Sequence, residues 1–298
     1  MKGCCWTVKI YEEREKIILE DIKDFELADI FECGQCFRWN REEDGSYIGV
    51  VKGKVIHVEK HENTVFLNNT TSQDFKGIWH DYFDLARDYG KIKETLGKKD
   101  PIMEKATAFG QGIRILRQEP WEALISFIVS ANRGISIIKK SIELLCEKYG
   151  EPIGEYRGKL YYAFPTPASL LNQRVEEINQ CKMGYRSRYI LDAAVIAAEE
   201  QIDIEQLRNL NTSDARTQLL RFTGIGPKVA DCILLFGYQK YDAFPVDVWV
   251  KRVMEYFYCP NAKNLKEIQQ DSQKRFGQLA GFAQQYLFYY ARSLGIGR

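Results

Sequence analysis

The sequence predicts an α+β fold, with an N-terminal antiparallel β-sheet domain packed on a mainly α-helical domain. Over the first hundred residues, short segments alternate apolar and polar side chains, which is typical of antiparallel strands. From about residue 101, apolar residues recur at helical spacing instead. Asp100 and Pro101 mark the change, because proline favours the first turn of a helix. We therefore expect a β-rich domain over residues 1–100 and a helical domain over residues 101–298.

The predicted sheet depends on three strand-like segments, residues 37–39, 46–60 and 63–69. Gly45 and Gly53 stand where the chain must turn between neighbouring antiparallel strands. The alternation of side chains within the segments favours a sheet with one face toward a core.

The clearest helical pattern lies in residues 135–150. Ile138, Ile142 and Leu145 share one face, and Gly150 is placed to end the helix. Thr166 and Pro167 predict the start of another helix, and Ser187 is a candidate N-cap for the alanine-rich stretch that follows it.

Composition and charge limit the class of protein. The formal net charge of the 298 residues is only +1, but Lys and Arg outnumber Asp and Glu by 11 to 6 when residues 219–298 are counted. Phosphate binding needs local positive potential, so this C-terminal excess is compatible with DNA. No apolar run approaches the roughly 18 residues of a membrane span, and the N-terminus lacks the apolar core of a signal peptide. We expect an intracellular protein without membrane association.

The cysteines are scattered through a chain large enough to fold without covalent cross-links, so we expect reduced thiols. They are Cys4, Cys5, Cys33, Cys36, Cys146, Cys181, Cys232 and Cys259.

The most informative segment is a helix, glycine turn and helix over about residues 213–238. Gly224 and Gly226 permit a sharp reversal, and Pro227 suits the first position of the second helix. Such a turn presents backbone N–H groups and a helix N-terminus to solvent, and both attract phosphate. A simple turn without a ligand is the alternative interpretation.

Lys228 lies in the first turn of that second helix, where a cation is disfavoured by the unpaired N–H groups. We expect it to lose its proton more easily than usual, and a neutral amine is the form that attacks electrophilic carbon. Taken alone, a solvated surface lysine is the simpler interpretation.

Asp247 follows Pro245 and precedes an apolar helical pattern, so it is predicted to be an N-cap. A capping carboxylate that faces a cleft could also stabilise positive charge on a sugar ring as a base departs.

The hairpin FTGIGPKVADC, Lys228 and the Pro-Val-Asp of residues 245–247 together resemble the helix-hairpin-helix DNA glycosylase superfamily. Four further segments, CGQCFRW, SFIVSANRGIS, MGYRSRY and AGFAQQYLFYY, are similar to segments of the 8-oxoguanine DNA glycosylases and spread over most of the chain. The resemblance implies a bifunctional DNA N-glycosylase/AP lyase of base excision repair. Lys228 would form a Schiff base that permits β-elimination, and Asp247 would stabilise charge.

The resemblance also implies a lesion pocket. The Gly34 carbonyl would read the oxidised base, because 8-oxoguanine carries a hydrogen at N7 where guanine has an acceptor. Gln284 would bind the Watson–Crick edge, Phe288 would stack on the ring, and Cys232 would form the opposite wall. Without the resemblance, Gly34 is a turn glycine and Phe288 a core residue.

Further residues are implied in binding the DNA itself. Asn132 would fill the vacated stack, Tyr185 would act as a wedge, and Arg186 would contact the orphaned cytosine. Gly224, Gly226 and Trp249 complete the predicted DNA-binding set; Trp249 stands where some relatives have histidine.

One position departs from the eukaryotic pattern. Ile137 stands where those enzymes have a second arginine that reads the opposite cytosine. An apolar side chain cannot donate to cytosine, so we expect a relaxed opposite-base preference.

No metal or cofactor is expected for the chemistry. Only Cys259 lies beyond Cys232, whereas one branch of the superfamily has a four-cysteine iron–sulfur loop there. Cys33 and Cys36 form a CxxC pair with no second pair, which argues against zinc or redox roles. A cation bridging the hairpin carbonyls and a DNA phosphate, as in relatives, stays open.

The predicted partner is duplex DNA containing oxidised guanine, bound by a monomer in the cytoplasm or nucleoid of a bacterium or the nucleus of a eukaryote. Two other functions stay open. A monofunctional glycosylase for alkylated bases shares the fold but does not use the lysine, so Lys228 argues against it. A non-catalytic helix-hairpin-helix DNA-binding protein needs no lesion pocket, so Gln284 and Phe288 argue against it.

Overall fold

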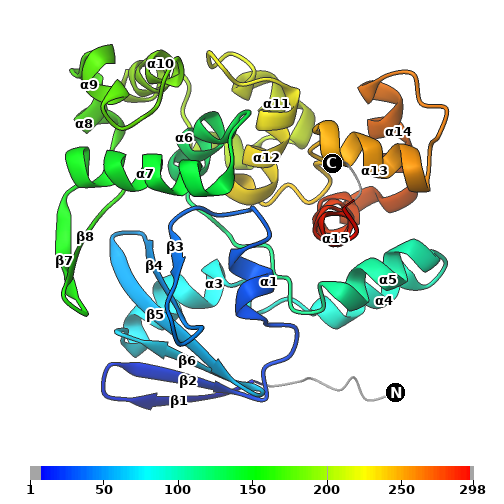
Figure 1. Cartoon of the computed structure of the whole chain (residues 1–298), viewed down its shortest axis with the longest axis horizontal. Coiled ribbons are helices and arrows are strands. Elements are labelled where there is room, and N and C mark those ends of the chain that lie inside the picture. The colour runs from blue at the N-terminus through cyan, green and yellow to red at the C-terminus, as the bar shows by residue number, and fades with distance from the viewer. Residues whose placement is uncertain (1–7, 200, 296–298) are drawn as a thin grey trace.

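The computed structural model describes residues 8–199 and 201–295 and has two modules, a sheet and a helical assembly that lies above it in Figure 1. The sheet has six described strands, all antiparallel, in the order β1-β2-β6-β5-β4-β3. The strands are β1 (Lys9–Glu13), β2 (Lys16–Glu20), β3 (Trp39–Arg41), β4 (Tyr47–Val51), β5 (Lys54–His61) and β6 (Thr64–Asn68).

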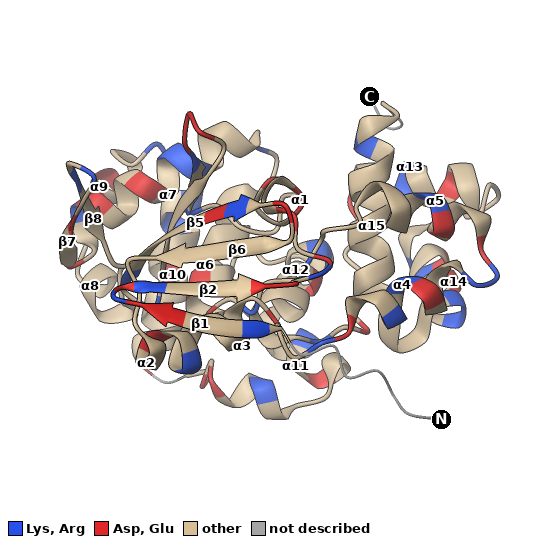
Figure 2. Ribbon diagram, turned by 90° about the horizontal axis from the view of Figure 1, so that it is seen from below, with Lys and Arg blue, Asp and Glu red and all other residues tan. Residues whose placement is uncertain are grey.

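Alternation along the strands gives the sheet one buried face. On β2, Ile17 and Leu19 are buried and lie opposite Leu67 and Val65 of β6. A one-residue slip would turn all four side chains to the wrong face, so the apolar pattern sets the register. On the outer face Figure 2 shows acidic and basic residues side by side along β1, β2 and β5. That face therefore lacks the single-sign potential that phosphate contacts require.

Short helices close the core of the sheet module. An aromatic cluster fills that core, with the Trp39 ring stacked on Phe31 at 4.0 Å between centroids and its N–H donated to the Tyr82 hydroxyl. The elements are α1 (Leu27–Phe31), α2 (Ser72–Asp74), the π-helix η1 (Phe75–Trp79) and α3 (His80–Tyr82).

The second module has a larger core of its own. It is built from α4 (Tyr89–Gly97), α5 (Pro101–Phe109), α6 (Pro120–Ser130), α7 (Ile135–Tyr149), α8 (Pro167–Leu171), α9 (Val175–Asn179), α10 (Arg186–Ala198), η2 (Gln206–Asn209), α11 (Thr212–Leu219), α12 (Pro227–Tyr238), α13 (Val248–Phe257), α14 (Leu265–Phe276), η3 (Gly277–Leu279) and α15 (Ala280–Ser293). A hairpin of β7 (Pro152–Tyr156) and β8 (Lys159–Tyr162) extends from α7 at one edge (Figure 1). No described helix is long and apolar enough to cross a bilayer.

The predicted α+β class is confirmed, and so are two helix starts. Asp100 caps α5 by accepting from the Ile102 and Met103 amides, and Thr166 caps α8 by accepting from Ser169. The prediction for Ser187 is wrong.

Ser187 is buried inside the first turn of α10, whose N-cap is Tyr185. Packing of the helix against its neighbours moved its start two residues upstream of the local capping signal. The sequence patterns also missed β1, β2 and the β7–β8 hairpin.

The domain boundary at residue 100 stays a prediction. Helix α4 precedes that residue, yet its buried Ile92 and Leu96 belong to the same core as the helices of the second module. The sheet core in turn reaches Leu116 on the segment that leads into α6.

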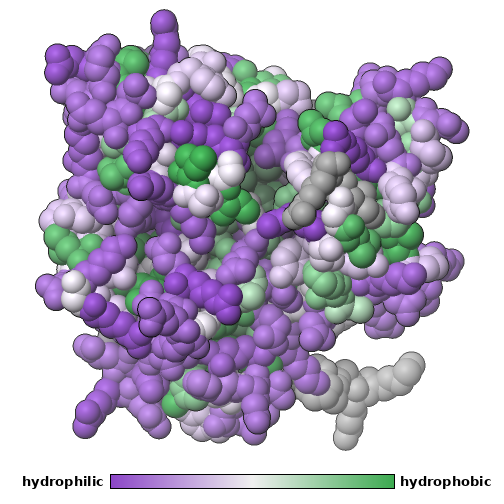
Figure 3. All heavy atoms as spheres, viewed as in Figure 1, coloured by the Kyte–Doolittle hydropathy of each residue, from purple (hydrophilic) through white to green (hydrophobic). Residues whose placement is uncertain are grey.

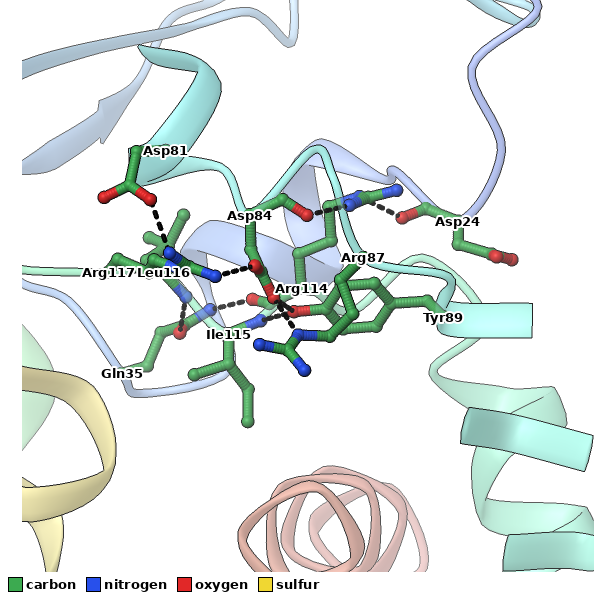
Figure 4. A network of polar contacts seen from close by, with 10 residues as sticks. All are labelled: Asp24, Gln35, Asp81, Asp84, Arg87, Tyr89, Arg114, Ile115, Leu116 and Arg117. Atoms are coloured by element: carbon green, nitrogen blue, oxygen red, sulfur yellow. Dashed lines mark hydrogen bonds and ion pairs between the residues drawn. The ribbon is translucent and has the colours of Figure 1, made fainter. Parts of the chain in front are cut away.

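A buried carboxylate anchors the junction between the modules (Figure 4). Asp84 accepts hydrogen bonds from Arg87 Nε at 2.5 Å, Arg117 Nη2 at 2.7 Å and the Tyr89 hydroxyl at 3.0 Å. Its carbonyl accepts from Arg114 Nη1 at 2.9 Å. The loop after α3 is thereby tied to the extended segment between α5 and α6.

We expect Asp84→Asn to lower the free energy of unfolding by about 3 kcal/mol, because it leaves two guanidinium groups without their buried anion. Asparagine is the suitable replacement because φ at this residue is +49°, a conformation that asparagine tolerates. Urea unfolding measures the change.

Asp81→Asn is the matched control. Asp81 also pairs with Arg117, but it is exposed, so the expected loss is under about 1 kcal/mol. Equal losses in the two variants would contradict the assignment of Asp84 as the anchor.

Candidate active site

The helix-hairpin-helix is present where the sequence predicts it, with α11 and α12 on either side of a turn at residues 220–226. Gly224 has φ +84°, and a Cβ there would overlap the Tyr189 ring, so both conformation and close approach require glycine. Gly226 is the N-cap of α12, and Pro227 occupies its first turn. The exposed turn can present its amides to an anion.

Lys228 and Cys232 lie one turn apart on α12, Lys228 half-buried and Cys232 buried. The Cys232 sulfur raises the pKa of Lys228 most, and the Asp247 carboxylate raises it further, against burial, which lowers it. Burial raises the pKa of the Cys232 thiol to about 11.

The expectation that Lys228 loses its proton easily is therefore wrong for the protein without DNA. The expectation considered only the partial positive charge of the helix N-terminus. The Cys232 sulfur lies one turn along the same helix, and tertiary structure adds the Asp247 carboxylate; together these two groups outweigh the effect of burial on the Lys228 pKa.

Asp247 has the predicted capping geometry. It is the N-cap of α13, and its carboxylate accepts from the Val250 amide at 2.8 Å. Its second oxygen is not used by that bond, and its charge acts on Lys228. One carboxylate thus starts a helix and presents a fixed negative charge beside the lysine.

Gly34 and Phe288 lie against each other, although 254 positions separate them (288 − 34). Gly34 has φ +86°, and a Cβ there would stand 3.6 Å from the Phe288 ring. Within residues 8–199 and 201–295, no group donates to the Gly34 carbonyl oxygen. One turn before Phe288, Gln284 is 6% exposed, and its buried Oε1 has no hydrogen-bond partner among the described residues.

Helix α15, which carries Gln284, contacts α12, which carries Lys228. A Cβ at Gly281 would overlap Leu235 of α12, and the Gly281 amide donates to the Tyr241 carbonyl at 2.7 Å. In Figure 3 the surface is hollowed beside the place that α12 occupies in Figure 1, and apolar residues show inside the hollow. The arrangement suits a flat ring with polar edges.

The residues expected to contact the opposite strand gather at the α6–α7 turn and the start of α10. Asn132 is exposed with φ +54°, and Tyr185 is 58% exposed. Arg186 is only 5% exposed; it donates to the Ala131 carbonyl, and its guanidinium stacks on the Tyr185 ring. Its contact with an orphaned base stays a prediction, because the side chain must first leave the Ala131 carbonyl.

Trp249 is half-buried in the first turn of α13, two residues after Asp247. Ile137 is 50% exposed on α7. The roles of Trp249 and Ile137 in DNA binding stay predictions.

The cysteines of the described residues are free thiols, and Cys4 and Cys5 lie outside those residues. No group of His, Cys, Asp and Glu side chains with metal-binding geometry occurs within the described chain. Burial raises the pKa of the Cys33 thiol to about 12, so Cys33 is an apolar wall residue at neutral pH.

Sequence reasoning missed Gln285 and Gln35, which hold the Gly34 turn. Gln285 donates to the Cys33 carbonyl at 2.9 Å, and Gln35 pairs with backbone groups of Arg114 and Leu116. The sequence signal for Gln285 was its position beside Gln284 on the apolar helix α15, since a buried amide requires hydrogen-bond partners.

The fold and this site define a helix-hairpin-helix base excision repair protein, and the comparisons agree. Residues 125–278 match the model of the HhH-GPD superfamily of base excision DNA repair proteins, and residues 17–124 match that of the 8-oxoguanine DNA glycosylase N-terminal domain. The chain belongs to the 8-oxoguanine DNA glycosylase family of that superfamily.

Individual relatives are similar over most of their length. A probable N-glycosylase/DNA lyase of Methanothermobacter thermautotrophicus is 35% identical over 72% of this chain and 74% of its own. The N-glycosylase/DNA lyase of Saccharomyces cerevisiae is 32% identical over 81% and 71%. The structure of Clostridium acetobutylicum 8-oxoguanine glycosylase/lyase, bound to duplex DNA with cytosine opposite 8-oxoguanine, is 46% identical with a TM-score of 0.93, covering 97% of this chain and 99% of that one.

The double role of Asp247 can be separated by substitution. We expect Asp247→Ala to lower the free energy of unfolding by about 1 kcal/mol, because the α13 cap is lost. Asp247→Asn keeps a capping oxygen and should change stability by only a few tenths of that. Thermal and urea unfolding measure both; a full loss in the asparagine variant would mean that the charge, not the cap, stabilises the fold.

Proposed function

We propose that this protein removes 8-oxoguanine from duplex DNA and then cleaves the strand at the resulting abasic site. The observation that carries the proposal is the position of Lys228. It follows the glycine turn directly and is influenced by Cys232 and Asp247. Its helix also contacts α15, which carries the unpaired acceptor of Gln284. A DNA-binding module without catalysis has no use for that combination.

Base recognition would use the unpaired acceptors. The N7–H of 8-oxoguanine can donate to the Gly34 carbonyl, whereas N7 of guanine presents a second acceptor and is repelled. Phe288 would stack on the extruded ring, Gln284 would pair with its Watson–Crick edge, and Cys232 would close the other side. Flipping costs a few kcal/mol of unstacking, which the pocket contacts offset.

The chemistry needs Lys228 as a free amine, so its ammonium must lose a proton in the DNA complex. The amine then attacks C1′ while the bond from C1′ to N9 breaks. The electron pair of that bond leaves with the base, which takes up a proton. Opening of the C1′–O4′ bond gives the imine. Loss of a C2′ proton then expels the 3′ phosphate. Asp247 would stabilise the positive charge at the sugar throughout.

DNA binding would combine the two exposed regions of this face. The amides around Gly224 and Gly226 would hold a phosphate, with Trp249 at the same edge. Asn132 and Tyr185 are exposed, so they would be free to enter the stack that the base vacates. A monomer carries all these groups, and its substrate places it inside the cell, with the nucleoid or the nucleus as its compartment.

Lys228→Gln tests the function directly. With duplex DNA containing 8-oxoguanine, borohydride should trap wild type as a covalent band on a denaturing gel, and the glutamine variant should give none because it has no amine. Lys251→Gln, at a half-buried lysine of α13 that pairs with Glu255, is the matched control and should be trapped like wild type. Absence of a band with wild type would favour a monofunctional glycosylase or a binder; trapping of Lys228→Gln would mean that another nucleophile reacts.

Ile137 tests the opposite-base preference. We expect wild type to excise 8-oxoguanine opposite all four bases at rates within about tenfold, and Ile137→Arg to favour cytosine by about a further tenfold, because a guanidinium can donate to it. Ile137→Leu, without a donor, is the control. Single-turnover rates on four duplexes measure the preference; equal discrimination by wild type and the arginine variant would contradict it.

A further inference from the structure

The two consecutive glutamines of α15 differ in their hydrogen bonding. Gln284 keeps a buried acceptor unpaired, whereas Gln285, 3% exposed, donates its amide to the Cys33 carbonyl at 2.9 Å. That bond joins residues 252 positions apart. It attaches the turn immediately before Gly34 to the helix that carries the rest of the pocket.

The other side of the turn is held by a separate set of bonds (Figure 4). Gln35 Nε2 donates to the Ile30 and Arg114 carbonyls at 2.9 and 2.7 Å, and its Oε1 accepts from the Leu116 amide at 2.9 Å. The Gln35 carbonyl accepts from Gln118 Nε2 at 2.7 Å. All of these contacts lie within buried structure.

Gly34 therefore stands between two anchored carbonyls, that of Cys33 bound by Gln285 and that of Gln35 bound by Gln118. Glycine with φ +86° has unusual backbone freedom, so its peptide groups would rotate if either anchor were lost. The Gly34 carbonyl itself has no donor among the described residues. Its direction is set by the two neighbours.

We propose that Gln285 is a positioning residue for lesion recognition: its bond to Cys33 fixes the Gly34 carbonyl in the direction that distinguishes 8-oxoguanine from guanine. The inference rests on the proposed function. Gln285 touches neither the base nor the sugar, so steps that need no base, such as cleavage of a preformed abasic site, proceed without its help.

Gln285→Met tests this, because methionine keeps the length and shape of the side chain and removes the donor. Single-turnover excision of 8-oxoguanine should fall about three- to tenfold, the effect of one hydrogen bond of ordinary strength, while cleavage of a preformed abasic-site duplex stays within about twofold of wild type. Tyr289→Phe is the matched control. It removes a different hydrogen bond from α15 to the sheet module, to Asp29 at 3.0 Å, and should leave both rates unchanged.

Binding supplies a readout that does not depend on turnover. In the Lys228→Gln background, Gln285→Met should reduce the preference for an 8-oxoguanine duplex over a guanine duplex by about three- to tenfold, with unchanged affinity for a tetrahydrofuran abasic analogue. Equal losses in excision and abasic cleavage, or an unchanged preference, would overturn the positioning role. Failure of wild type to excise 8-oxoguanine while it prefers the lesion in binding would overturn the proposed function and leave the inference standing; no preference in wild type would overturn both.

Discussion

The hydrogen bond between Gln285 and the Cys33 carbonyl, together with the contact of Gly34 with Phe288, joins the two ends of the chain. Two parts of the fold line the pocket. One wall is a turn of the sheet module, and the other is α15, the last described helix. Lys228 and Asp247 could act only if this junction formed, because a nucleophile needs a substrate held at a fixed place. Gln285 and Cys33 are buried, so water does not compete for the hydrogen bond between them.

The buried network around Asp84 holds the segment to which Gln35 of that junction is bonded (Figure 4). On the extended segment before α6, Arg117 pairs with this carboxylate and Arg114 donates to the Asp84 backbone carbonyl. The same segment supplies backbone partners of Gln35. Charges placed in a core are costly unless they are paired, so the network tolerates few alternative arrangements of the segment. The turn that carries Gly34 is consequently docked on a segment with one well-defined position.

The protonation state of Lys228 controls the reactivity of the site. Cys232 and Asp247 raise the pKa of Lys228, which favours its ammonium form in the protein without DNA. A charged lysine behind the phosphate-binding turn attracts the backbone but does not attack sugars. In the proposed reaction the amine forms in the DNA complex, which would couple the chemistry to binding. A modest net charge is compatible with this arrangement because helix and turn amides supply part of the positive potential.

Local rules in the sequence determined the α+β class, the hairpin with Gly224 and Pro227, the helix starts at Asp100 and Thr166, and the cap at Asp247, since each depends on residues within about one turn of one another. Resemblance to the family added the pocket residues Gly34, Gln284 and Phe288. Tertiary structure alone decided the start of α10 ahead of Ser187, the influence of Asp247 on Lys228 and the hydrogen bond of Gln285 to Cys33. These features depend on groups brought together from distant parts of the chain, and no local pattern records which buried amide or carboxylate will stand beside which partner.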